Sequence, residues 1–201
     1  MPFNPAQNHK IDKLDYNPAG FIVEFRGPYR FLSNFFPCDV EYEGLTYPSS
    51  EHAFQAAKST NKVYRREMQG CLDGATAKAK GRSVAMRPGW SQMRVGVMFE
   101  IVWNKFHSNL TLRSDLIRTG NMTLIEGNDW NDQFWGVSRN IGQNWLGNIL
   151  MNVRFRLAHG LAIDIPLADA DLRKLGLLLY PLPPTRIATE IRKAQPPDLK
   201  T

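Results

Sequence analysis

Residues 47–58 constrain the fold of this chain more than any other stretch, and their sequence is YPSSEHAFQAAK. Pro48 favours an extended shape for the residue before it, and either of the two serines that follow can cap the N–H groups of a helix. Alanines on one side of that helix would let another element pack close. Another side, at about 100° per residue, carries Glu51, Gln55 and Lys58. The stretch therefore predicts a helix with a carboxylate, an amide and an ammonium group near its N-terminus.

This polar stripe has two interpretations. Glu and Lys side chains on one helical face are usually solvated, and such pairs contribute only about 0.2–0.5 kcal/mol. Alternatively, the stripe is one wall of an active site, with Glu51 in the first turn, where the helix dipole favours a negative charge. The remainder of the chain has to decide between the two.

The composition is that of one globular domain with appendages: 201 residues, of which 43% are hydrophobic and 22% charged. We expect a leader over residues 1–20, a domain over residues 21–162 and a partly disordered extension over residues 163–201. Within that extension, a short helix is expected over residues 169–179, before a proline-rich stretch.

The two cysteines and four histidines argue against a disulfide framework and a zinc site, since no CxxC pair or HExxH-type spacing occurs. We expect free thiols in a reducing compartment. The first ten residues hold no apolar signal core, and no apolar run is long enough to span a bilayer. These observations predict a cytoplasmic protein without a membrane partner.

The formal net charge is +6, and residues 185–201 contribute two of these charges through four basic and two acidic side chains. A modest positive field suits phosphorylated or polyanionic substrates. Lys78, Lys80 and Arg82 surround Gly81, and such a stretch either holds a phosphate or forms a solvated helix end. Charge alone does not predict nucleic-acid binding, because no zinc finger, RNP-like run or long basic stretch is present.

Periodicity predicts a mainly α-helical fold with a small β-hairpin element. Residues 40–47 alternate on both sides of a Glu-Gly pair, which is typical of a hairpin. A short β-type run covers residues 21–25, and a turn follows at residues 26–29. Apolar residues recur at helical spacing in several further segments. The predicted helices cover residues 61–69, 93–106, 110–117 and 144–159.

Two segments place polar side chains among large aromatic residues. In residues 30–37, Ser33 and Asn34 stand between phenylalanines, where they either bond to the local backbone or point into a pocket. In residues 124–136, three carboxylates stand beside three large aromatic residues. That segment is either an Asx-rich surface loop or a loop that folds over something, because exposing three large aromatic side chains is costly.

The order of these motifs resembles the NADAR (YbiA-like) family over roughly residues 21–161. Several motifs agree in both order and spacing. They are Phe31-Leu32-Ser33-Asn34-Phe35, residues 47–58, Gly81-Arg82, Trp90, Asn131-Asp132-Gln133-Phe134-Trp135-Gly136, and Gly142 through Met151.

The resemblance implies a single, mainly helical domain with a small β-element that cleaves N-glycosidic bonds. One branch of the family hydrolyses ribosylamino-pyrimidine phosphates that arise early in riboflavin synthesis. Another branch removes ADP-ribose from guanine bases and accompanies a DNA-modifying toxin. The family name reflects a proposed link to NAD and ADP-ribose. The chemistry requires neither a metal nor a cofactor.

Cleavage of the sugar C1–N bond builds positive charge on the ribose, so it needs a nearby carboxylate and an acid that protonates the leaving nitrogen. The matching motifs supply Glu51, Glu126 and Asp132 as carboxylates. Lys58 either contacts a phosphate or attacks C1 of the ring-opened sugar to give a Schiff base. The second role requires a well-desolvated amine, because neighbouring carboxylates would otherwise keep it protonated.

The resemblance also implies a set of substrate-binding residues. The aromatic residues would stack on the base, the asparagines would read its edge or the ribose hydroxyls, and the arginine would bind phosphate. These residues are Phe31, Ser33, Asn34, Gln55, Arg82, Trp90, Trp135, Gly136 and Asn144.

The chain departs from the family at residues 137–141, where members often carry a glycine-rich run. We expect this loop to be stiffer and more basic, with Arg139 able to contact a phosphate. Three functions stay open: an N-glycosidase for ribosylamino-pyrimidine phosphates, a hydrolase of ADP-ribosylguanine in DNA, and a non-enzymatic module that binds NAD or ADP-ribose. The joint presence of Glu51, Lys58 and Asp132 argues for an enzyme, since a binder of anions needs fewer carboxylates.

Overall fold

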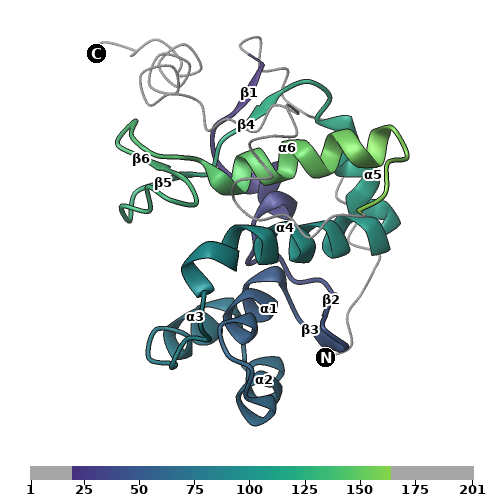
Figure 1. Ribbon diagram of the computed structural model, residues 1–201. Coiled ribbons are helices and arrows are strands. Elements are labelled where there is room, and N and C mark those ends of the chain that lie inside the picture. Colours follow the sequence, from purple (N-terminus) through teal and green to yellow (C-terminus); the bar gives the residue numbers. More distant parts are fainter. Residues whose placement is uncertain (1–19, 164–201) are drawn as a thin grey trace.

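The computed structural model describes residues 20–163, which form a mainly helical domain with three small two-stranded sheets (Figure 1). The expected fold class, mainly α with a β-hairpin, is confirmed. The predicted leader, and the extension with its predicted helix at residues 169–179, lie outside the described residues apart from residues 20 and 163.

The helices and strands keep the order that periodicity predicted, and all four predicted helices are confirmed to within three residues at each end. The strands are β1 (Phe21–Ile22), β2 (Val40–Tyr42), β3 (Leu45–Tyr47), β4 (Thr123–Leu124), β5 (Gly127–Asn128) and β6 (Val137–Ser138). The helices are the 3₁₀-helix η2 (Gly27–Leu32), α1 (Ser50–Ala57), α2 (Lys62–Gln69), α3 (Gly74–Lys80), α4 (Trp90–Ser108), α5 (Leu110–Arg118) and α6 (Trp145–Ala158).

Helix α4 is the central element, and its apolar side chains form much of the core. It packs against α1, α5, α6 and β2, and Figure 1 shows α6 on one side of it and α1 on the other. Ile101 and Phe106 of α4 are fully buried, as are Ile149 and Val153 of α6. The helix begins three residues earlier than predicted, directly after Gly89, whose φ of 73° turns the chain into it.

Helix α1 lies among other elements, and all eight of its residues are buried. Ser49 is its N-cap and accepts a hydrogen bond from His52 N, so the predicted serine cap is confirmed. Ala53, Ala56 and Ala57 are fully buried. Their small side chains let α2, α3 and α4 pack around the helix, as the sequence predicted.

Strands β2 and β3 pair antiparallel with Val40 opposite Tyr47, which confirms the hairpin. Its turn residues, Glu43 and Gly44, have positive φ values of 44° and 75°, as a tight two-residue hairpin turn requires. The hairpin ends two residues before α1 begins, and both of its strands contact that helix.

The N-terminal part of the domain differs from the prediction. Of the β-type run at residues 21–25, only β1 pairs, and its partner is β4 in parallel register. The turn predicted at residues 26–29 is instead the start of η2, because Pro28 near the helix N-terminus has the backbone angle that a helix needs. The loop at residues 124–136 also contains short strands, β4 and β5, of which β5 pairs with β6.

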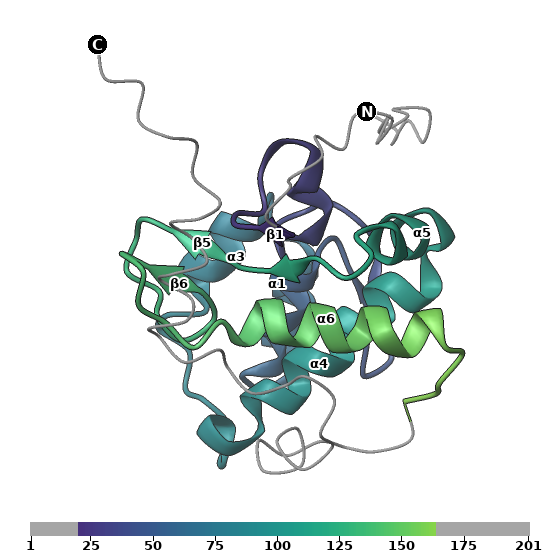
Figure 2. The ribbon, with the colours of Figure 1, turned by 90° about the horizontal axis from the view of Figure 1, so that it is seen from above.

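Asn144 ties the start of α6 to the end of β4 (Figure 2 shows β4 running beside α6). Its backbone is left-handed, with φ 53°, and its side chain is fully buried. Its Nδ2 donates to Leu124 O at 2.8 Å, while Oδ1 accepts from Glu126 N at 2.9 Å. Asn144 therefore fixes the backbone of Glu126.

We expect Asn144→Ala to destabilise the domain, because it leaves Leu124 O and Glu126 N without these partners. Each unpaired buried group costs about 1–3 kcal/mol, and alanine tolerates a left-handed backbone poorly. Urea unfolding measures the loss. Asn131→Ala is the matched control, since Asn131 is also left-handed, at φ 64°, but exposed. Equal losses in both variants would mean that backbone strain, rather than the two hydrogen bonds, sets the cost.

Candidate active site

Glu51 and Gln55 form a buried pair on α1. Gln55 Nε2 donates to Glu51 Oε1 at 2.8 Å, and the backbone N of Glu51 donates to Asn34 O at 2.9 Å. The two side chains are 5% and 4% exposed, so the interpretation as a solvated face is wrong for them. Burial raises the pKa of Glu51, although the bond from Gln55 and the charge of Lys78 oppose the rise.

Lys58 lies one turn further along this helix and is half-buried. Its Nζ donates to Gly81 O at 2.8 Å. Burial lowers the pKa of Lys58; the Glu51 carboxylate opposes this, whereas the positive charges of Lys78 and Arg82 add to it. The amine thus has the partial desolvation that a nucleophile needs.

Gly81 is required for the contact between α1 and the end of α3. A Cβ at this position would overlap Gln55 Oε1. Any larger residue would therefore displace the amide that donates to Glu51. The same residue supplies the carbonyl that holds Lys58, so this glycine sets the geometry of both neighbours.

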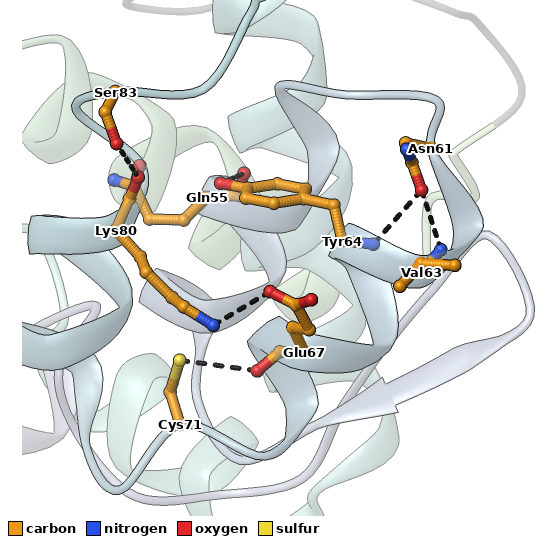
Figure 3. A network of polar contacts seen from close by, with 8 residues as sticks. All are labelled: Gln55, Asn61, Val63, Tyr64, Glu67, Cys71, Lys80 and Ser83. Carbon is orange, nitrogen blue, oxygen red and sulfur yellow. Dashed lines mark hydrogen bonds and ion pairs between the residues drawn. The ribbon is translucent and has the colours of Figure 1, made fainter.

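A polar network on the other side of α1 joins α2 to α3 (Figure 3). Lys80 Nζ lies 2.9 Å from Glu67 Oε2, and Tyr64 OH donates to Gln55 O at 3.2 Å. Asn61 Oδ1 caps α2 by accepting from two backbone N–H groups. Lys80 is therefore engaged with α2, unlike Lys58.

Glu126 and Asp132 lie in the loop between β4 and β6. Asp132 Oδ1 accepts from Phe134 N at 3.1 Å and Trp135 N at 2.9 Å, which fixes its carboxylate. Glu126 Oε2 is inaccessible to solvent and has no hydrogen-bond partner among residues 20–163. Burial and the charge of Asp132 raise the pKa of Glu126 to about 7, and Lys78 opposes the rise.

The loop that carries Asp132 is in contact with α1, the helix that carries Glu51. Trp135, whose N donates to Asp132 Oδ1 at 2.9 Å, packs its ring on Phe54 of α1 with centroids 5.2 Å apart. The charge of Asp132 acts to raise the pKa of both Glu51 and Glu126, and the charge of Lys58 acts to lower the pKa of Glu51. The predicted catalytic residues thus belong to two segments that pack together, and their catalytic roles stay predictions.

Ser33 and Asn34 lie against the N-terminus of α1. Asn34 is buried; its Nδ2 lies 3.3 Å from Met98 Sδ, and its Oδ1 has no partner in the part of the chain that the structure describes. Ser33 O accepts from Lys105 Nζ at 2.8 Å. Lys105 is itself buried, and desolvation lowers its pKa to about 8. The Lys105 ammonium thus holds Ser33, and the carbonyl of the next residue, Asn34, accepts from the backbone N of Glu51.

The predicted aromatic residues occupy two different places. Trp90 and Trp135 each pack on Phe54 of α1, with ring centroids 5.2 Å apart in both pairs. Phe31 is 3% exposed and meets Phe106 edge-on in the core. The structure therefore groups Trp90 and Trp135 with α1 but leaves Phe31 as a core residue, and stacking on a base stays a prediction for all three.

The other predicted binding residues are also placed. Arg82 is exposed, just after α3. Gly136 packs so closely on the β4–β5 segment that a Cβ there would overlap Glu126 O. Asn144 has both ends of its amide bonded to backbone groups. Binding of substrate by Arg82, Gly136 and Asn144 stays a prediction.

Sequence reasoning did not single out Lys78 and Lys105. Lys105 follows Ile101 by four residues, so it falls on the buried face of a predicted amphipathic helix, and a charge at that position was an available signal. Lys78 was grouped with Lys80 and Arg82. Helical periodicity places Lys78 and Lys80 about 200° apart, and it could have separated them.

Within residues 20–163, no group of three His, Cys, Asp or Glu side chains is arranged to hold a metal ion. In the same part of the chain, none of the helices has the length and apolar character needed to cross a bilayer.

Comparison with known proteins gives a consistent result. The NADAR domain model matches residues 20–158. N-glycosidase YbiA of Shigella boydii is 35% identical over 65% of this chain and 82% of its own length. Riboflavin biosynthesis protein VVA0006 of Vibrio vulnificus is 38% identical over 63% of this chain, but over only 35% of its own length. The NMR structure of Escherichia coli YbiA gives a TM-score of 0.62 at 32% identity, covering 69% of this chain and 84% of that one.

We expect Glu126→Gln to raise stability more at pH 8 than at pH 4. The pKa of Glu126 is raised from 4.5 to about 7 in the folded chain. The unfolded chain therefore loses this proton at lower pH, and wild-type stability falls as pH rises from the unfolded to the folded pKa. Glutamine cannot ionise, so the variant avoids this loss.

Melting temperatures of wild type and Glu126→Gln at the two pH values measure the effect. Glu67→Gln is a suitable control, because Glu67 is exposed. A melting-temperature difference that is the same at both pH values would contradict the burial of an ionisable Glu126.

Proposed function

This chain belongs to the NADAR domain family of YbiA-like N-glycosidases, and we propose that it hydrolyses the bond between ribose C1 and the amine nitrogen of a ribosylamino-pyrimidine phosphate. The enzyme class follows from the family; the substrate and the residue roles are the proposal. The observation that carries it is the contact between α1, with its buried Glu51, and the loop of Asp132, where Trp135 packs on Phe54.

Glu126 is the proposed general acid. A carboxyl group with a pKa of about 7 keeps a substantial protonated fraction at neutral pH. Its buried Oε2 has no partner in the described residues, so its capacity for a hydrogen bond is unused by the protein. Protonation of that nitrogen lets the base depart as a neutral amine.

Asp132 and Glu51 are the proposed stabilisers of positive charge at C1. The Asp132 carboxylate is held by two backbone N–H groups, so it needs little reorganisation when charge develops on the sugar. Glu51 is fixed from two directions by Gln55 and by Asn34 O. Water supplies the final hydroxyl at C1, and the products are ribose phosphate and the free amino-pyrimidine.

Lys58 is the proposed nucleophile. Its amine attacks C1 of the ring-opened sugar and displaces the base amine, which leaves a Schiff base; water then adds to that bond and frees the lysine. The lowered pKa supports this role, since it increases the fraction of neutral amine. The alternative role, a phosphate contact, requires no covalent bond.

The choice of a pyrimidine substrate is supported by the relative that is named a riboflavin biosynthesis protein. ADP-ribosylguanine in DNA is the second candidate, and the net charge of +6 favours it because DNA is polyanionic. Two of those charges lie in residues 185–201, which weakens that support. A non-enzymatic role is disfavoured by the relatives named N-glycosidases.

Turnover of two substrates tests the proposal directly. The purified chain is incubated with 5-amino-6-ribosylaminouracil 5′-phosphate and, separately, with ADP-ribosylated DNA, and release of the base or the modified group is followed. We expect turnover of the pyrimidine. Turnover of the DNA alone would replace the first candidate with the second, and turnover of neither would overturn both.

We expect Glu51→Gln to lower kcat by about 10²–10³-fold, the usual cost of removing one electrostatic stabiliser of the transition state. Glutamine keeps the size of the side chain, so the fold should survive, which far-UV circular dichroism checks. Glu67→Gln on α2 should retain wild-type turnover, because Glu67 pairs with Lys80 and is not one of the proposed catalytic residues. A Glu51→Gln enzyme with the wild-type rate would exclude Glu51 from catalysis.

Borohydride trapping separates the two roles of Lys58. We expect wild type and substrate, treated with sodium borohydride, to give a ribose phosphate adduct on Lys58 that mass spectrometry locates. Lys58→Arg keeps the charge but should yield no adduct and little turnover. If wild type hydrolyses the substrate without forming an adduct, and Lys58→Arg is also active, Lys58 contacts the phosphate instead of attacking C1.

A further inference from the structure

The three basic side chains near the end of α3 differ in their surroundings. Lys80 is exposed and forms an ion pair with Glu67 at 2.9 Å (Figure 3). Lys78 is half-buried and forms no ion pair with any described residue. Its charge acts on the pKa of Glu51 and of Glu126, which belong to separate parts of the site. Lys78 is therefore a half-buried cation without a carboxylate partner among the described residues, whereas Lys80 is paired with α2.

An exposed aromatic ring lies beside Lys78. Its Nζ is 5.5 Å from the ring centroid of Phe35, which is 37% exposed. A Cβ on Gly74 would come within 2.9 Å of the Phe35 ring and 3.3 Å of Glu51 Cβ. The Phe35 ring, the start of α3 and helix α1 thus meet at Gly74. Phe35 reaches solvent from this position, and it holds the ammonium by a cation–π contact.

Three positive charges gather at this end of the site. Lys58 Nζ donates to Gly81 O at 2.8 Å, which places it against the stretch that carries Lys78 and Arg82. The charges of Lys78 and Arg82 add to the lowering of the Lys58 pKa, which is due first to burial. None of the three forms an ion pair within 4.0 Å of a described carboxylate. Like charges held together without a partner are stabilised by a bound anion. A phosphate dianion also matches several N–H donors at once.

We propose that Lys78, held by the ring of Phe35 and assisted by Arg82, binds the 5′-phosphate of the substrate. This inference rests on the proposed function, because it takes a sugar phosphate as the ligand. It assigns the phosphate to one lysine of the basic stretch and excludes Lys80. The phosphate end of the substrate then lies next to Lys58, which the proposed chemistry places at C1 of the same sugar.

Substrate pairs with and without the phosphate test the assignment. We compare kcat/KM for 5-amino-6-ribosylaminouracil 5′-phosphate and for its dephosphorylated form. Lys78→Met should lower the preference for the phosphorylated substrate by about 10- to 100-fold, the effect of losing a charge-assisted hydrogen bond. Lys80→Met on the same helix should leave it unchanged. Phe35→Leu should give a smaller loss than Lys78→Met, and Phe35→Tyr should restore the preference.

If Lys78→Met lowers kcat/KM equally for both substrates, the inference is overturned, since Lys78 would then only balance the charge of the carboxylates. A second measurement does not depend on turnover: NMR titration with ribose 5-phosphate and with ribose. We expect wild type to bind the phosphate form more tightly and Lys78→Met to lose that difference. If wild type turns over neither substrate, the proposed function fails, and this titration alone still decides whether Lys78 binds phosphate.

Discussion

The complete burial of α1 is the constraint on which the rest of the site depends. A helix that is buried on every side has little water for its polar groups, so they depend on partners within the protein. Glu51 takes Asn34 O for its amide and Gln55 for its carboxylate. Gly81 is small enough to admit the Gln55 amide, and it also binds Lys58 through its carbonyl. Segments far apart in the sequence are thus positioned by their contacts with one short helix.

Burial also shifts the pKa values of ionisable groups in the candidate site, and this lowers the stability of the fold. Desolvation moves the pKa of Glu51 and Glu126 upward and that of Lys58 downward, so all three are shifted toward their neutral forms. Glu126, with a pKa of about 7, can exchange protons near neutral pH, which is the requirement for acid–base catalysis. The fold tolerates them because buried contacts hold the backbone on either side, as Asn144 does for Glu126 and Lys105 does for the loop before α1.

Local patterns predicted the helices and the hairpin well, because capping, helical periodicity and turn residues act over a few neighbouring positions. The choice between neighbouring residues could not be predicted in the same way. Phe31 and Phe35 both flank Ser33-Asn34, yet the first is in the core against Phe106 and the second is exposed beside Lys78. That difference follows from how the loop packs on α1 and α4. It could not be predicted from the positions of the two phenylalanines in the sequence. The choice of Glu51, Glu126 and Asp132 as catalytic carboxylates came from the resemblance to the family rather than from local patterns, and it stays a prediction.

Residues 137–141, which depart from the family pattern, form a tight turn. Arg139 and Asn140 both have positive φ, 51° and 64°, and Ser138 and Ile141 exchange two backbone hydrogen bonds around them. The segment is therefore a closed two-residue turn, formed by residues less suited to it than glycine. Ser138 is the last residue of β6, which pairs with β5. Where a glycine-rich run could take several shapes, this turn is closed by two backbone hydrogen bonds and holds both of its central residues in the left-handed region.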